Sequence, residues 1–158
     1  MFEKLHMKPL SLRAALILVA ATVTGAVASA DAVGTVEINA TDTMQYSIQR
    51  IEASPGEKVR VVLTVVSKMS KSSMAHNFVL LASGVDPAGI AVEALVARGN
   101  GYLPTRQPER ILASTRLVGG GETATVVFTA PKEPGTYVYI CTFPGHFNNG
   151  MRGELIVK

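Results

Sequence analysis

The sequence predicts an all-β protein, a β-sandwich of seven or eight short strands with one inserted helix. Apolar and polar residues alternate over several short stretches, which is the pattern of strands with one buried face. Clusters rich in Gly and Pro separate these stretches. One stretch, after residue 86, instead carries the start signals of a helix. Regularly spaced short strands of this kind are typical of a sandwich.

In the first half of the chain, strands are expected where apolar residues alternate at 36–40 and 44–48. The segment SPGE at 54–57 predicts a turn, and a strongly β-branched run follows at 59–65. Residues 68–73 are polar and predict a loop. The apolar segment 76–81 then predicts another short strand.

The inserted helix is expected over residues 88–98. Asp86 is a candidate N-cap, and Pro87 suits the first helical position. Gly99 is a plausible C-terminal stop, and residues 100–108 then form a loop.

The second half of the chain predicts four more stretches of strand. Alternation resumes at 111–117 and at 124–130, with a flexible triple-glycine turn between them. A proline-rich turn precedes 137–141, where Tyr137, Tyr139 and Cys141 share one face. Leu155 and Val157 mark the last strand.

The first thirty residues are predicted to be a secretory signal rather than part of the fold. Three cations precede an apolar run at 14–21, and Ala28-Ser29-Ala30 is a small-x-small cleavage site. The apolar run is shorter than the roughly 20 residues of a membrane span, so cleavage is favoured over a retained anchor. The predicted domains are therefore a signal peptide at 1–30 and one mature domain at 31–158. The lack of a twin-Arg pair favours Sec export.

Composition excludes several classes of function. The chain of 158 residues has 47% hydrophobic and 17% charged residues, as expected for one globular domain. The leader carries three cations and one carboxylate, so its removal lowers the net charge from +3 to +1. Clustered Lys and Arg are absent, and no nucleic-acid partner is predicted.

The cysteine and histidine inventory is the most informative observation. The single Cys cannot form an internal disulfide, and a lone thiol in an oxidising compartment needs burial or an occupant. Cys141, His146 and Met151 lie in one loop between two predicted strands, and His76 lies at a distant strand end. One thiolate, two imidazoles and one thioether form a soft ligand set. Trigonal His₂Cys with a weak axial Met is the arrangement of a blue-copper electron-transfer site.

Three other interpretations stay open at this point. A copper delivery or storage protein would use similar ligands but would want exposed thioethers, for which Met69 and Met74 are the only support. An enzyme with Cys141 as nucleophile and His146 as base would need an orienting acid and an oxyanion hole, which the motif does not supply. A structural sandwich without metal would leave the lone thiol unexplained.

Three motifs give the chain a resemblance to a known family. CTFPGH at 141–146, MAHN at 74–77 and MQY at 44–46 resemble azurin-like cupredoxins, including the auracyanins. The similarity extends over residues 35–158. It implies a Greek-key cupredoxin sandwich, one type 1 copper ion that alternates between Cu(I) and Cu(II), no enzymatic activity, and single-electron transfer in the periplasm.

The resemblance also implies roles for individual residues. His76, Cys141 and His146 would be equatorial copper ligands and Met151 a long axial ligand, with the carbonyl of Ala75 as a weak second axial contact. Asn77 would brace the ligand loop by hydrogen bonds, and Phe143 would pack over the site. A docking patch around His146, the expected exit for the electron, would consist of Met44, Met74, Phe143, Pro144 and Phe147.

Several features depart from azurin. The usual disulfide cannot form, the buried Trp has no counterpart except Phe78, and Val65 stands where azurin often has a pH-sensitive His. Four residues separate His146 from Met151, one more than in usual azurins.

The resemblance implies c-type cytochromes, a nitrite reductase or a terminal oxidase as redox partners. We expect a monomer that does not insert into a membrane once the signal is removed.

Overall fold

The computed structural model describes residues 33–158. The predicted signal peptide at 1–30 lies outside these residues. In the part of the chain that is described, no helix is long and apolar enough to cross a membrane.

One layer of the fold is a three-stranded sheet. Its order is β1 (Gly34–Thr41), β3 (Lys58–Val66) and β8 (Thr123–Thr129). β1 runs parallel to β3, and β8 runs antiparallel to it. Alternate residues of β3 are buried, as its β-branched sequence predicts for a strand with one face on the core.

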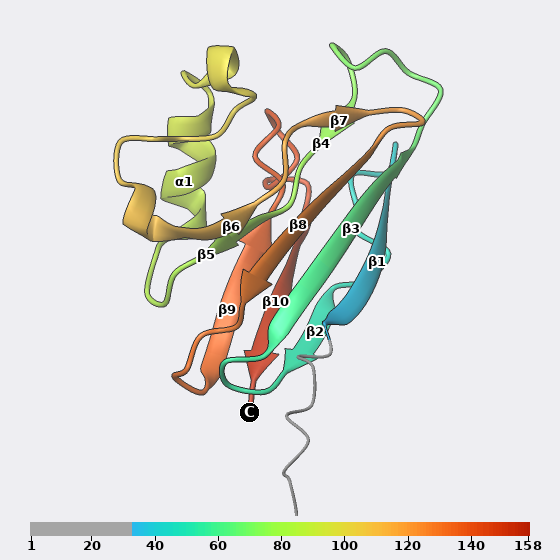
Figure 1. Cartoon of the computed structure of the whole chain (residues 1–158). Helices are drawn as coiled ribbons and strands as arrows, with labels where there is room; N and C mark the ends of the chain where they lie inside the picture. The colour runs from blue at the N-terminus through green and yellow to red at the C-terminus, as the bar shows by residue number, and fades with distance from the viewer. Residues whose placement is uncertain (1–32) are drawn as a thin grey trace, which may run out of the picture.

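The other layer is a five-stranded sheet, whose last two strands in the sequence flank the loop at 141–151. Its order is β2 (Arg50–Ala53), β10 (Arg152–Val157), β9 (Gly135–Ile140), β5 (Val79–Leu81) and β6 (Ile111–Ser114). A short ribbon of β4 (Ala75–His76) and β7 (Val118–Gly119) bridges the upper edges of the two layers (Figure 1).

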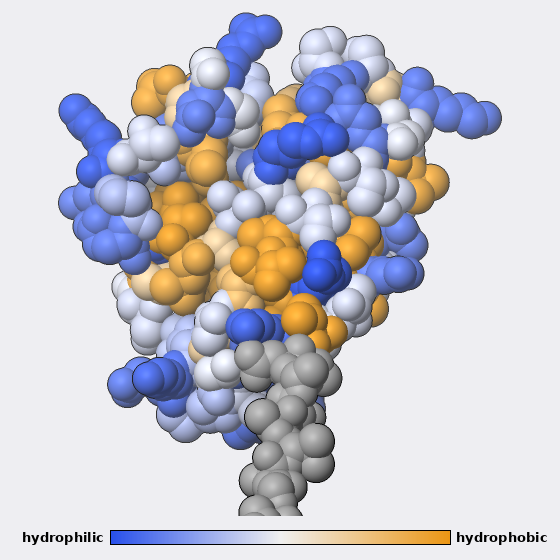
Figure 2. Space-filling model, in the orientation of Figure 1, coloured by the Kyte–Doolittle hydropathy of each residue, from blue (hydrophilic) through white to orange (hydrophobic). Residues whose placement is uncertain are grey.

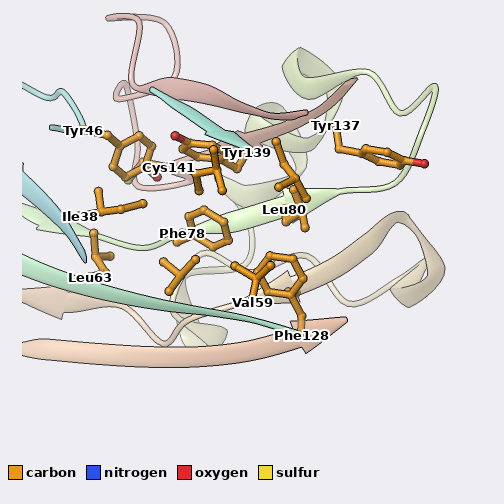
Figure 3. Packing of buried hydrophobic residues seen from close by; sticks show 14 of the residues in the cluster. Ile38, Tyr46, Val59, Leu63, Phe78, Leu80, Phe128, Tyr137, Tyr139 and Cys141 are labelled. Atoms are coloured by element: carbon orange, nitrogen blue, oxygen red, sulfur yellow. The ribbon is translucent and has the colours of Figure 1, made fainter. Parts of the chain in front are cut away.

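The core lies between the two layers. Phe78 is at its centre, with ring centroids 4.8 Å from Tyr139 and 6.4 Å from Phe128 on the opposite sheet (Figure 3). Cys141 lies at the edge of the same cluster. Phe78 therefore occupies the centre of the core, in a chain that contains no tryptophan. The absence of a disulfide leaves apolar burial as the main stabilising term.

The helix α1 (Pro87–Ala94) covers the outer face of the five-stranded sheet. Asp86 caps it by accepting hydrogen bonds from the N–H groups of Ala88 and Gly89, each at 3.0 Å. Ile90 packs in a second apolar cluster with Val79, Leu81 and Ile140. Two 3₁₀ turns, η1 (Arg98–Asn100) and η2 (Pro108–Arg110), follow the helix.

The all-β fold with one helix is confirmed, but several predicted elements need correction. The described residues form ten strands rather than seven or eight, because two of the strands have only two residues. Residues 44–48 are not a strand: Met44 has a positive φ of 55°, and Tyr46 forms only an isolated bridge to Ala40. The strand lies instead at β2, where Ile51 and Ala53 alternate with polar residues and which the prediction missed.

Two other boundaries differ from the prediction. The segment 76–81 is interrupted at Asn77 and Phe78, so that β4 and β5 pair with different partners. The helix ends at Ala94 rather than Arg98, and a 3₁₀ turn replaces its last turn.

The strands place the two ends of the described segment and the candidate metal-site loop at opposite ends of the molecule. β1 begins and β10 ends at the lower end in Figure 1, where Lys158 lies. The loop between β9 and β10, residues 141–151, lies at the upper end beside β4 and β7.

Candidate metal centre

Three metal-binding side chains from two distant parts of the chain meet at the upper end of the sandwich. His76 ends β4, Cys141 follows β9, and His146 lies in the turns that follow. Cys141 Sγ is 3.5 Å from His146 Nδ1 and 4.0 Å from His76 Nδ1. The three donor atoms lie within 4.8 Å of one another, so one ion could contact all three.

Met151 adds a fourth donor. Its Sδ atom is 3.1 Å from His76 Nδ1. Its N–H donates to the carbonyl of His146 at 3.0 Å, and its own carbonyl accepts from the N–H of Cys141 at 3.2 Å. These backbone bonds close the loop at its base. The four residues between His146 and Met151 are accommodated by tight turns that include Gly145 and Gly150, both with positive φ.

Burial sets the protonation state of all three candidate ligands. Cys141 and His76 are fully buried, and His146 is 2% exposed. Loss of solvation lowers the pKa of His76 and of His146 to about 4, so both rings are neutral at pH 7 with a free lone pair. Burial raises the pKa of the Cys141 thiol to about 12, and N–H groups of Asn77 and Phe143 directed at the sulfur partly offset this. A bound cation would displace the thiol proton.

Asn77 connects the two ligand-bearing segments. Its side-chain N–H donates to Thr142 Oγ1 at 2.7 Å, and its Oδ1 accepts from the N–H of Thr142 at 2.9 Å. The Tyr46 hydroxyl donates to the Asn77 carbonyl at 2.5 Å. The peptide after His76 is thus fixed against the peptide after Cys141, which holds the donor atoms in place without a metal.

Two aromatic side chains in contact pack beside His146. The Phe143 ring lies 4.8 Å from the His146 ring, and Tyr102 meets Phe143 edge-on at 5.3 Å. Tyr102 has a positive φ of 59°, an uncommon conformation for an aromatic residue. The segment after α1 therefore supports the ligand loop from the side.

The predicted docking residues fall into two groups. Met44, Phe143, Pro144 and Phe147 are partly exposed. Met74 is 8% exposed, and its N–H donates to the Ser70 carbonyl in the turn at 70–73. Its place in the docking patch stays a prediction. Ala75 is buried in β4 directly before His76, and its carbonyl contact stays a prediction.

Sequence reasoning missed several residues around the site. Thr142 and Tyr46 lie in the quoted motifs, but their hydrogen bonds to Asn77 span 65 and 31 residues of chain. Tyr102 carries no local signal at all. Only the three-dimensional packing reveals these partners.

The residues present fit a copper ion. The donors are two imidazoles, one thiol and one thioether, a set that favours copper over hard, oxygen-preferring cations. The Nδ1 atoms and the sulfurs face one another in a buried site, and His76 Nε2 has no hydrogen-bond partner among the described residues. No carboxylate is part of the group.

Comparison with known proteins supports the same conclusion. The chain matches the family model "Copper binding proteins, plastocyanin/azurin family" over residues 32–158. It is 34% identical to an azurin of Achromobacter denitrificans over 146 residues, which are 90% of this chain and 95% of that protein. It is also 34% identical to auracyanin-A of Chloroflexus aurantiacus, over 78% of this chain and 74% of that protein.

Solved structures agree with the sequence relatives. The reduced auracyanin of Roseiflexus castenholzii has a TM-score of 0.71 and 32% identity, covering 80% of this chain and 98% of that one. Azurin iso-2 of Methylomonas has a TM-score of 0.70 and 32% identity. The predicted copper cofactor and azurin-like cupredoxin fold are thus confirmed at the level of the family. Its fold, its donor set and its relatives together make this chain a blue copper protein of the plastocyanin/azurin family.

Proposed function

We propose that this protein carries single electrons between redox proteins, with copper held by His76, Cys141, His146 and Met151. The observation that carries the proposal is the convergence of these four donors in one buried site. When bound, copper supplies the one-electron couple between Cu(I) and Cu(II). The carbonyl of Ala75 would be a weak additional contact.

The residues of the chain contribute geometry and exclusion of water. The two hydrogen bonds between Asn77 and Thr142 keep His76 and Cys141 at a fixed separation. Since the site is buried, the donors do not have to exchange solvent when the charge of the metal changes. The neutral histidines bind no proton near pH 7, so electron transfer need not be coupled to proton uptake.

The exit for the electron is assigned to His146. Its ring is nearly buried, and the partly exposed Phe143 ring packs 4.8 Å from it. We place Pro144, Phe147, Met44 and Met74 in the same patch. A small apolar patch suits a transient complex that dissociates quickly. Candidate partners are c-type cytochromes, a nitrite reductase or a terminal oxidase.

The location and the state of the protein are also proposals. Export by the predicted leader at 1–30, followed by cleavage, would deliver a monomeric carrier to the periplasm. A lone thiol is compatible with that oxidising compartment because Cys141 is buried.

The burial of the donors argues against the alternatives. Copper delivery would use exchangeable, exposed thioethers, but Met151 is fully buried and Met74 nearly so, which leaves only Met69, 45% exposed, to support it. A cysteine nucleophile would need a depressed thiol pKa, whereas the pKa of Cys141 is raised to about 12.

The test is the absorption spectrum of the purified mature protein with added Cu(II). We expect an intense orange-red band that disappears on one-electron reduction and returns on oxidation. Cys141→Ser should abolish the band, and Met69→Leu, at an exposed methionine outside the site, should retain it. A colourless protein that binds copper tightly would favour delivery or storage. Failure to bind copper would refute the proposal.

A further inference from the structure

We propose that the upper end of the molecule docks a redox protein whose exposed cofactor edge is surrounded by carboxylates. This inference rests on the proposed electron-carrier function and adds the charge of the partner. The docking surface consists of the ligand loop, the exposed face of α1 and a set of cations that we call the basic rim: Lys68, Lys71, Arg98, Arg116 and Arg152.

The basic rim lies in the loops that build the metal centre. Lys68 and Lys71 belong to the segment that leads into β4, and Arg116 lies two residues before β7, the partner of β4. Arg98 begins the turn that leads to Tyr102, whose ring contacts Phe143. Arg152 stands over the Phe147 ring at 5.9 Å.

These segments also meet one another. Lys71, Gly99, Asn100 and Arg116 line one hollow of about 510 Å³ at this end. All five members of the basic rim are exposed. Figure 2 shows hydrophilic side chains projecting along the upper edge, above the apolar front of the molecule.

Few carboxylates oppose this charge. The same loops contain Asp42 and Glu122, and Glu122 is already bonded to Lys71 at 2.8 Å and Arg116 at 3.0 Å. Glu154 also lines a hollow with Arg152, so five cations against three carboxylates leave a surplus of two at this end. Residues 33–158 as a whole contain 12 Lys and Arg against 10 Asp and Glu, so the remaining seven cations and seven carboxylates balance. The positive charge is therefore concentrated where the electron would leave.

An apolar surface beside the basic rim indicates that the partner is a protein rather than a small anion. Val92, Leu95 and Val96 of the α1 end are 65%, 53% and 91% exposed. Ala91, Val92 and Leu95 border the same hollow as Phe143 and Phe147, so the apolar surface runs from the ligand loop onto the helix. An apolar centre with a charged margin is the usual anatomy of a protein interface, and the charge steers the encounter.

The test uses two inorganic oxidants of opposite charge on the reduced copper protein. Hexacyanoferrate(III) is an anion and tris(phenanthroline)cobalt(III) a cation, and each accepts one electron. Stopped-flow recovery of the orange-red band gives the rate at about 0.1 M salt, where charges more than about 10 Å apart are screened. The variant Lys68→Gln with Arg98→Gln removes two cations that have no ion pair among the described residues.

We expect the double variant to react about threefold or more slowly with hexacyanoferrate(III) and faster with the cobalt complex. The control, Arg60→Gln with Lys132→Gln, makes the same charge change on β3 and on the turn before β9. It should alter both rates by less than about 1.5-fold. Equal rate changes in the double variant and the control, or equal changes with the anionic and the cationic oxidant, would refute the proposed role of the basic rim. Either result would leave the carrier function intact. Failure of the carrier function would instead appear as a missing reversible band in the unmodified protein.

Discussion

The two hydrogen bonds between Asn77 and Thr142 give the most direct test of how the segments after His76 and Cys141 are held together. Asn77→Ala would remove both hydrogen bonds at a site where Asn77 is 1% and Thr142 2% exposed. The buried N–H of Thr142 would lose its acceptor, which costs about 2 kcal/mol, and its hydroxyl would lose a donor, which costs about 1 kcal/mol. We expect the free energy of unfolding to fall by about 3 kcal/mol.

Urea denaturation of the copper-free protein measures this loss. With a slope of about 1.5 kcal/mol per M, the midpoint should fall by about 2 M. Asn39→Ala is the matched control, because Asn39 is exposed on β1 and should change stability by less than about 0.5 kcal/mol.

A double-mutant cycle then isolates the pair. Asn77→Ala with Thr142→Ala should be less destabilising than the sum of the single variants, since the second change removes the unpaired hydroxyl. A midpoint shift below about 0.5 M for Asn77→Ala would refute the idea that this pair fixes the two segments.

Three other predictions concern stability. Gly153→Ala should destabilise the protein by about 3 kcal/mol in urea denaturation, because a Cβ at Gly153 would stand 2.2 Å from the Tyr139 ring. The control Gly99→Ala has open space around it and should be nearly neutral. Equal losses of stability in the two variants would contradict the argument. Tyr46→Phe should cost about 1–2 kcal/mol in thermal or urea unfolding, because the buried Asn77 carbonyl loses its donor; an unchanged midpoint would argue against this role. The copper-free protein should lose stability as the pH falls from about 6.5 to about 4, because the unfolded histidines take up protons that His76 and His146, with folded pKa values of about 4, do not. Urea midpoints should fall between pH 7 and pH 4.5, and a midpoint that does not change with pH would exclude this linkage. The pKa of Glu122 is lowered to about 2 by Lys71 and Arg116, so the contribution of Glu122 to stability is lost only at lower pH.

The local sequence pattern could predict those strands in which the apolar residues of the alternation are also the buried ones. β3 and β8 bury every second residue against a single core, so their sequences alone indicated them. Residues 44–48 alternate equally well, yet Tyr46 is buried while Ile48 is 36% exposed. Their conformation is decided by Met44 in a left-handed turn and by the Tyr46 bond to Asn77, neither of which is visible locally.

The metal centre divides in the same way. His76, Cys141, His146 and Met151 could be proposed because rare residue types stand at informative spacings. The split of 76–81 into β4 and β5 could not, since it depends on Asn77 turning its side chain toward Thr142 across 65 residues. Met74 is nearly buried, which the polar, exposed residues 70–73 before it do not indicate.

The placement of both described chain ends far from the ligand loop has a practical consequence. Lys158 lies at the lower end of the sandwich, and β1 begins there as well. A linker to an electrode, a bead or a fused domain attached after Lys158 would leave His146 and its surroundings facing outward. Oriented immobilisation through this end should therefore preserve access for a redox partner, whereas random coupling through surface lysines would also attach molecules by Lys68 and Lys71 and obstruct the face they are meant to present.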